Sequence, residues 1–272
     1  MRKKRLWVFI LTLLMFLSAA LLGVSTVYRV SEVTVYAPVV SKEAQAEAKQ
    51  LQSRLFDAYE KDSTLFVNDE KAKAIVDEFP YFHLTKFERA YPNRIIIEVQ
   101  EESEVFAVPV SDGNAYYILG ATSTVLGVRE SYENRSDGVK TVLITGLNAT
   151  GEKGEPLAGD DCLDSLFTVL GQMHERLGGI RRNLRSVEVQ RLATDAKQTM
   201  FVCTTVEGVK LYIRNPYQDG LEKANAAMDA YFALSDAERL TGVVLVYDGE
   251  SGVKTQYFTQ IDAFETGSVS LN

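Results

Sequence analysis

The sequence predicts an α+β protein: an N-terminal transmembrane helix, a small β-α-α-β-β domain, then a larger mixed β domain with two helices and a C-terminal edge hairpin. Three observations predict it: an uncharged run near the N-terminus, helical patterns followed by alternating strands up to residue 100, and many short strands beyond it. The expected parts are a cytoplasmic tail, the transmembrane helix, the first domain, the β domain and a C-terminal tail, at 1–5, 6–28, 29–100, 101–258 and 259–272.

The N-terminus combines a basic tail with an apolar run. Residues 2–5 are all Lys or Arg, and no charged residue follows until Arg29. At about 1.5 Å per residue, a helix over this run crosses a hydrocarbon core of about 30 Å. A cleavable secretory signal is the alternative, since residues 18–20 are small, but its apolar core is usually only about 7–15 residues. The basic tail favours a cytoplasmic N-terminus, which places the bulk of the chain outside.

Charge and cysteine content restrict the partners. The chain has 37 acidic and 29 basic residues, and four of the basic ones lie in the N-terminal tail. The exported part is therefore acidic, which disfavours nucleic acid as a partner. Cys162 and Cys203 match no metal or disulfide framework, although one bridge between them stays open in an oxidising exterior. Cys203 lies in an apolar run, which is more typical of a buried, inert thiol.

The first domain begins with a strand near 33–36. Ser41 then caps a helix whose apolar face carries Ala44, Ala48, Leu51, Leu55 and Ala58. A second helix is expected from Asn68 as N-cap, with acidic residues in its first turn, to Pro80 as its terminator.

A β-hairpin over residues 79–101 follows. Pro92 fixes the turn, and Ile95, Ile97 and Val99 alternate with more polar positions as in a half-buried strand. The two helices are therefore expected to cover one face of a three-stranded sheet.

The β domain is expected to consist of short strands separated by Gly, Asp, Asn and Ser clusters. One helix carries apolar residues from Leu163 to Leu177 and stops at Gly178; another carries Leu221, Ala224, Met228 and Phe232. The polar connection 129–140 is expected to be mobile, and 259–272 a loose tail. Strands are expected at 105–110, 116–119, 125–128, 142–145, 184–189, 200–206, 209–214, 243–247 and 254–258.

Motifs for catalysis or metal binding are weak. His83 and His174 lack a second His at ligand spacing, so a zinc site is not expected. The cluster of Asp160, Asp161 and Asp164 lies at a helix start, where carboxylates accept hydrogen bonds from exposed backbone amides. No G-x-S-x-G turn or phosphate loop with a lysine is present. Paired carboxylates for sugar cleavage stay open, because sequence gives no distances. No cofactor and no metal are expected. A chain of short strands with exposed edges instead indicates recognition by strand pairing.

The order of these segments resembles the bacterial cell-division family DivIB/FtsQ, in which a short basic tail and one span precede a POTRA domain and a β domain. In the POTRA part the resemblance is carried by Ser63-Thr-Leu-Phe66, Phe79-Pro80-Tyr81, Lys86-Phe-Glu-Arg89, Tyr91-Pro92-Asn93 and Ile95-Ile-Ile-Glu-Val99. In the β part it is carried by Tyr116-Tyr-Ile-Leu119, Ile144-Thr-Gly146-Leu147, Asn183-Leu-Arg-Ser-Val187, Gly208-Val-Lys-Leu-Tyr-Ile213, the Lys223-bearing helix and Gly242-Val-Val-Leu-Val-Tyr-Asp248. Tyr36-Ala37-Pro38, Gln100-Glu101-Glu102 and Leu119-Gly120 depart from the family pattern.

The resemblance implies a non-enzymatic scaffold of the division complex at the septum, a single-pass membrane protein that takes no small-molecule substrate. The implied partners are small bitopic coiled-coil proteins of the FtsL and FtsB/DivIC types, bound by β-strand addition at 243–258. A proline at Leu245 is then expected to abolish capture of the partner without unfolding the chain. The partner-binding residues expected at outward or edge positions are Val244, Val246, Tyr247, Lys254, Gln256 and Phe258.

Two other functions compete with this interpretation. One is an exported cell-envelope enzyme, a wall hydrolase or transpeptidase with a POTRA-like adaptor. The other is a POTRA-type chaperone or secretion component, which is disfavoured by the N-terminal anchor, the single POTRA unit and the absence of barrel-length alternating strands.

Overall fold

The computed structural model describes residues 2–111, 114–132, 140–191 and 199–259. Residues 133–139 of the connection expected to be mobile, and 260–272 of the expected tail, lie outside these ranges. The chain divides into two compact units, Met1–Glu102 and Ser103–Asn272. The division lies two residues after the end expected for the first domain at residue 100.

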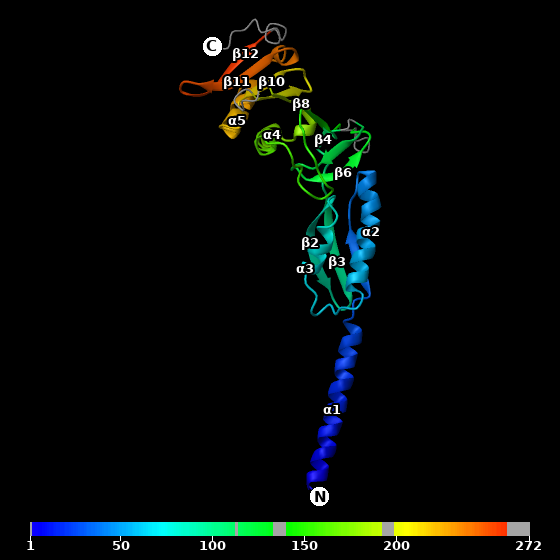
Figure 1. Cartoon of the computed structure of the whole chain (residues 1–272). Helices are drawn as coiled ribbons and strands as arrows, with labels where there is room; N and C mark the ends of the chain where they lie inside the picture. The colour runs from blue at the N-terminus through cyan, green and yellow to red at the C-terminus, as the bar shows by residue number, and fades with distance from the viewer. Residues whose placement is uncertain (1, 112–113, 133–139, 192–198, 260–272) are drawn as a thin grey trace. The chain divides into compact units, whose positions relative to one another are not determined.

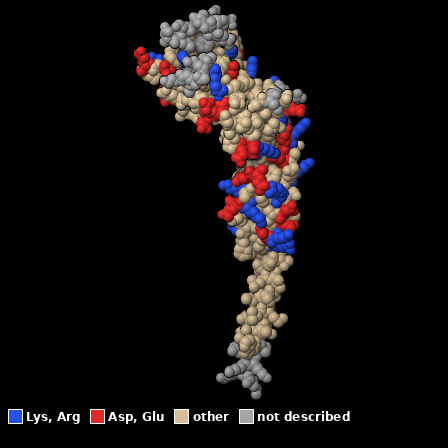
Figure 2. Space-filling model, viewed as in Figure 1, with Lys and Arg blue, Asp and Glu red and all other residues tan. Residues whose placement is uncertain are grey.

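One N-terminal helix is long and apolar enough to cross a membrane. Helix α1 spans Arg2–Val27, and its apolar stretch Phe9–Val27 has 19 residues and a mean hydropathy of 2.3. None of this stretch is buried against the rest of the chain. Figure 2 shows no charged side chain along the apolar stretch Phe9–Val27, whereas Lys, Arg, Asp and Glu are scattered over the folded part that follows.

The first unit contains a three-stranded sheet in the order β1-β3-β2, with β1 parallel to β3 and β2 antiparallel to it (Figure 1). Ile95, Ile97 and Val99 of β3 are buried, whereas Ile96 and Glu98 between them are only half-buried, so the expected alternation is confirmed. Residues Ala44, Leu51 and Leu55 form the buried side of α2. The element bounds are β1 Glu32–Tyr36, α2 Lys42–Tyr59, α3 Glu70–Val76, β2 Phe82–Ala90 and β3 Arg94–Glu101.

The second helix of this unit differs from its prediction at both ends. Its N-cap is Asp69 rather than Asn68, because the Asn68 side-chain amide donates instead to the Glu70 carboxylate at 3.0 Å. The helix ends at Val76, four residues before Pro80. The amides of Glu78 and Phe79 bond in turns to Ile75 and Val76, so the chain already leaves the helix before the proline.

The second unit is a nine-stranded sheet in the order β12-β11-β10-β9-β8-β7-β4-β5-β6, with helices α4 and α5. The largest core contains buried residues of both helices and most of these strands, and a smaller cluster of Met200, Val202, Tyr212, Val243 and Leu245 lies apart from it. The strand bounds are β4 Phe106–Pro109, β5 Tyr116–Leu119, β6 Val125–Arg129, β7 Val142–Thr145, β8 Leu184–Arg191, β9 Thr199–Thr205, β10 Lys210–Arg214, β11 Val243–Gly249 and β12 Gly252–Phe258.

The helices of this unit show one confirmed and one partly wrong prediction. Helix α4 runs from Leu163 to Leu177 and ends at Gly178 in the left-handed conformation, as expected. Helix α5 spans Gly220–Ala233 and buries Ala224 and Met228, but Leu221 and Phe232 are 52% and 44% exposed. The buried stripe continues through Ala227 and Tyr231 instead, and it includes Lys223. Short 3-10 turns complete the unit at Ile180–Arg182 and Glu238–Leu240.

Replacing Gly146 by alanine should destabilise the second unit by more than about 2 kcal/mol. Gly146 has φ +80°, and an added Cβ would lie 2.1 Å from the carbonyl oxygen of Val189. Gly171 on the exposed side of α4 has open space around it, so Gly171→Ala should stabilise by up to about 1 kcal/mol through helix propensity. Urea unfolding of both variants measures the difference. Equal effects of the two substitutions would contradict the Gly146 geometry.

Candidate functional site

The C-terminal hairpin provides the candidate site. Strand β12 is the terminal strand of the nine-stranded sheet and pairs with β11 in one regular antiparallel register from Val243–Phe258 to Gly249–Gly252. Within the described residues, no strand pairs with its other edge. A terminal strand presents main-chain N–H and C=O groups that an extended segment of another chain can pair with.

Two of the six expected site residues do not face outward. Val244 and Val246 are fully buried in the large core, so their expected outward or edge position is wrong. The reason is that β11 lies between β10 and β12, and both of its faces are covered. Val243 and Leu245 are fully buried as well, in the smaller cluster. Leu245 lies opposite Tyr212 and Gln256 in a strand that is paired on both sides, so a proline there would remove one ladder hydrogen bond and place its ring inside the sheet. We therefore expect this substitution to destabilise the fold, whereas the sequence alone predicts that the fold stays intact.

The other four expected residues are accessible to different degrees. Lys254 and Gln256 are exposed on β12. Tyr247 of β11 and Phe258 of β12 are partly buried against the smaller cluster. These four lie on one face of the hairpin, because Tyr247 pairs with Lys254, Leu245 with Gln256, and Val243 with Phe258. Lys254, Gln256 and Phe258 lie on the terminal strand itself, whereas Tyr247 lies one strand further in.

The main-chain groups of the open edge follow from the hairpin register. Gly249 and Gly252 pair across the two-residue loop Glu250–Ser251. In such a hairpin the pair closing the loop exchanges hydrogen bonds, and bonded and non-bonded pairs then alternate. The N–H groups of Val253, Thr255 and Tyr257 therefore point away from β11. Sequence reasoning missed these residues, although the glycines bracketing Glu250 and Ser251 could have fixed the register.

A buried lysine stabilises the hairpin close to its loop. Lys223 of α5 is fully buried, and its Nζ donates to the Asn215 carbonyl at 2.8 Å and lies 2.7 Å from Asp248 Oδ1. The Asn215 side-chain amide donates to Asp248 Oδ2 at 2.9 Å. These contacts join α5, the end of β10 and the end of β11. No sequence pattern indicates this cluster, because a lysine inside a helix is normally solvated.

Acid should weaken this cluster. Burial acts to raise the pKa of Asp248, but hydrogen bonds from Lys223 and Asn215 outweigh it and hold the pKa below the ordinary value. Because the folded pKa is lowered, the stabilisation is present above the ordinary carboxyl pKa of about 3.9 and is lost as pH falls through the folded value. Urea unfolding between pH 7 and pH 3 should show a smaller acid-induced loss in Asp248→Asn than in the native chain. Parallel losses would contradict this assignment.

The groups considered for catalysis have structural contacts. Asp160 accepts the amides of Asn148 at 2.8 Å and of Cys162 at 3.1 Å, and it forms an ion pair with Arg191. Cys162 and Cys203 are unbridged and buried, and burial raises the pKa of each thiol to about 12. Such thiols are poor nucleophiles near neutral pH.

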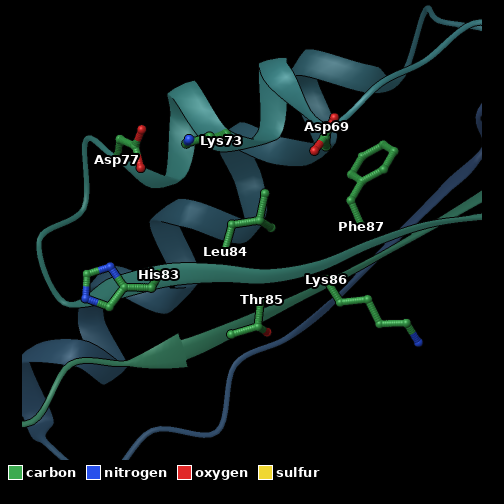
Figure 3. A pocket seen from close by; sticks show the side chains of 8 residues that line it. All are labelled: Asp69, Lys73, Asp77, His83, Leu84, Thr85, Lys86 and Phe87. Carbon is green, nitrogen blue, oxygen red and sulfur yellow. The ribbon is translucent and has the colours of Figure 1, made fainter.

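A second concave surface lies in the first unit between α3 and the edge strand β2, with a volume of about 330 Å³ (Figure 3). Leu84 and Phe87 point from β2 toward α3, while Lys86 points away. His83 contacts Glu102 at 2.7 Å. The register of β2 shifts between Leu84 and Lys86, and a bulge and charged side chains of this kind discourage strand addition. The regular edge of β12 is the better pairing surface.

Comparison with known proteins finds no family model that matches the chain and no matching curated protein.

Proposed function

We propose that this chain is a non-enzymatic, membrane-anchored scaffold of the bacterial division complex that binds small bitopic coiled-coil proteins by β-strand addition. The observation that carries the proposal is the regular, unpaired outer edge of β12 in the described part of the chain. A scaffold needs a surface that another chain can extend, and this edge supplies main-chain groups at alternate residues.

The apolar helix α1 supports the anchoring part of the proposal. With basic residues on its N-terminal side, it would leave both folded units on the extracytoplasmic side. The sequence runs that resemble the DivIB/FtsQ family supply the division role. On this proposal the first unit is the POTRA domain, and the partners are of the FtsL and FtsB/DivIC types. The protein then concentrates at the septum.

The partner segment is expected to be extended and to pair antiparallel or parallel to β12. Each main-chain hydrogen bond contributes about 0.5–1.5 kcal/mol net, so a few of them give only modest affinity. Specificity would come from side chains beside the edge, above all Lys254, Gln256 and Phe258, which the partner's alternate residues would contact.

A fluorescent fusion of the full chain tests the role in division. The proposal expects fluorescence to gather at midcell before constriction. Uniform peripheral fluorescence, together with turnover of cell-wall fragments by the purified chain, would contradict the scaffold and favour an exported wall enzyme. A fusion lacking residues 2–27 serves as the control, because a division scaffold held by α1 should lose its membrane position with that helix.

A further inference from the structure

The chain that leaves α1 is fixed to two loops of the first unit. The carbonyl of Tyr28, the residue after the helix, accepts the amide of Thr64 at 2.8 Å. The amide of Val30 donates to the Asp62 carbonyl at 2.9 Å, and that of Ser31 to the Asn93 carbonyl at 2.9 Å. The loop 60–67 and the turn 91–93 are therefore held directly against the first residues beyond α1.

Thr64 makes this junction firm. Its side chain is fully buried, and its hydroxyl bonds to the Tyr28 carbonyl at 3.2 Å and to the Pro92 carbonyl. One buried side chain thus joins the segment after α1, the loop and the turn. A buried hydroxyl that lost these partners would remain unsatisfied, so the three segments are expected to stay together.

Aromatic side chains are exposed at this junction. Phe66 is 85% exposed, more than any other large hydrophobic side chain in the described residues, and Tyr91 is 57% exposed. The rings of Tyr28 and Tyr91 contact edge-to-face with centroids 6.2 Å apart. Phe66 is two residues from Thr64, so the Cα atoms of the two residues are at most about 7 Å apart. All three aromatics are therefore close to the end of α1.

The length of α1 places that end at a bilayer surface. The apolar stretch Phe9–Val27 has 19 residues, which at about 1.5 Å each matches a hydrocarbon core of about 30 Å. Tyr28 then enters the headgroup layer, where Tyr and Trp are enriched because their rings suit an interface between hydrocarbon and water.

We propose that Tyr28, Phe66 and Tyr91 form a membrane-contact surface. This surface lies in the headgroup layer of the bilayer crossed by α1, and the Phe66 ring inserts into that layer. The bilayer is the occupant because this surface is continuous with the span through residues 28–31. Charges around it are mixed: Arg29 donates to the Glu60 carbonyl, and the ammonium groups of Lys61 and Lys71 lie 3.5 Å and 2.9 Å from the carboxylates of Glu60 and Asp62, so contact is not expected to need anionic lipid. The inference rests on α1 spanning the membrane, one part of the proposed function, and not on partner binding.

Tryptophan fluorescence of the full chain in phosphatidylcholine vesicles tests the proposal. Trp7 is the only native tryptophan. In a Trp7→Phe background, Phe66→Trp places a reporter in the membrane-contact surface. Tyr36→Trp gives a matched control, because Tyr36 is 56% exposed and lies at the far end of β1, about 13 Å along the strand from Glu32. Vesicles carry lipid brominated on the acyl carbons nearest the headgroup, and equal thermal stability of both variants verifies the fold.

The expected result is quenched emission at position 66, shifted to shorter wavelength, and unquenched emission at position 36. Quenching of Trp7 in the native chain reports whether α1 is inserted. Quenched Trp7 with no quenching at position 66 would overturn the membrane-contact surface and leave the anchor intact. Unquenched Trp7 would overturn both the surface and the anchor. Quenching at position 66 only when phosphatidylglycerol is added would overturn aromatic insertion in favour of charge attraction.

Discussion

Replacing Thr255 by proline should abolish capture of the bitopic partner while leaving the chain folded. Thr255 is exposed in the middle of β12, and its N–H points away from β11 by the hairpin register. Proline removes that donor, and its ring occupies the space where a partner strand must lie. Proline is tolerated on an edge strand when the lost N–H faces solvent, so the ladder to β11 should persist.

Thr255→Val is the matched control for this prediction. Valine keeps the N–H and suits a strand, so partner capture should stay near the native level. Co-purification of the membrane-reconstituted chain with FtsL-type and FtsB/DivIC-type proteins measures capture, and circular dichroism verifies the fold. Native capture by a folded Thr255→Pro variant would exclude addition of a strand at this edge.

Asp248→Asn should destabilise the second unit by about 3 kcal/mol. The substitution removes the charge facing Lys223, a cation that is fully buried. Removing one member of a buried pair usually costs about 3–5 kcal/mol, since the remaining charge has no compensation. The lower end of that range applies because the Asp248 side chain is 40% exposed.

Removing the lysine of this pair should cost less stability than removing the aspartate. The difference between the two losses is the sharper test. Lys223→Met keeps the aliphatic volume, and water can solvate the remaining Asp248, so a loss of about 1 kcal/mol or less is expected. Urea unfolding of both single variants and the double variant gives the coupling between them. Glu250→Gln, at the exposed hairpin loop, should change nothing. If Lys223→Met were the more damaging variant, burial of the lysine charge would not be the dominant cost.

Local patterns in the sequence predict much of this fold. The alternation of Ile95, Ile97 and Val99 predicts a half-buried strand, and β3 has that pattern. The apolar spacing from Leu163 and the stop at Gly178 define α4. In these segments the periodicity and the turn residue agree with the tertiary contacts, so nothing overrides the local preference.

Positions that depend on tertiary pairing are not predicted in this way. Val244 and Val246 lie on a strand whose two faces are both covered, and a continuous apolar run does not distinguish that case from a half-exposed strand. The burial of Lys223 depends on the meeting of α5 with Asn215, which lies 8 residues away in sequence, and with Asp248 of β11, which lies 33 residues from Asn215. The same applies to the open edge, because only the sheet order identifies β12 as terminal.

Residue-resolved amide hydrogen exchange, with and without the purified bitopic partner, tests strand addition at β12 most directly. The account predicts that the amides of Val253, Thr255 and Tyr257 exchange quickly in the isolated chain and become protected in the complex. Lys254 and Gln256, whose amides point to β11, should be protected in both states. Protection of Val253, Thr255 and Tyr257 before the partner is added, or their continued fast exchange in the complex, would contradict the account.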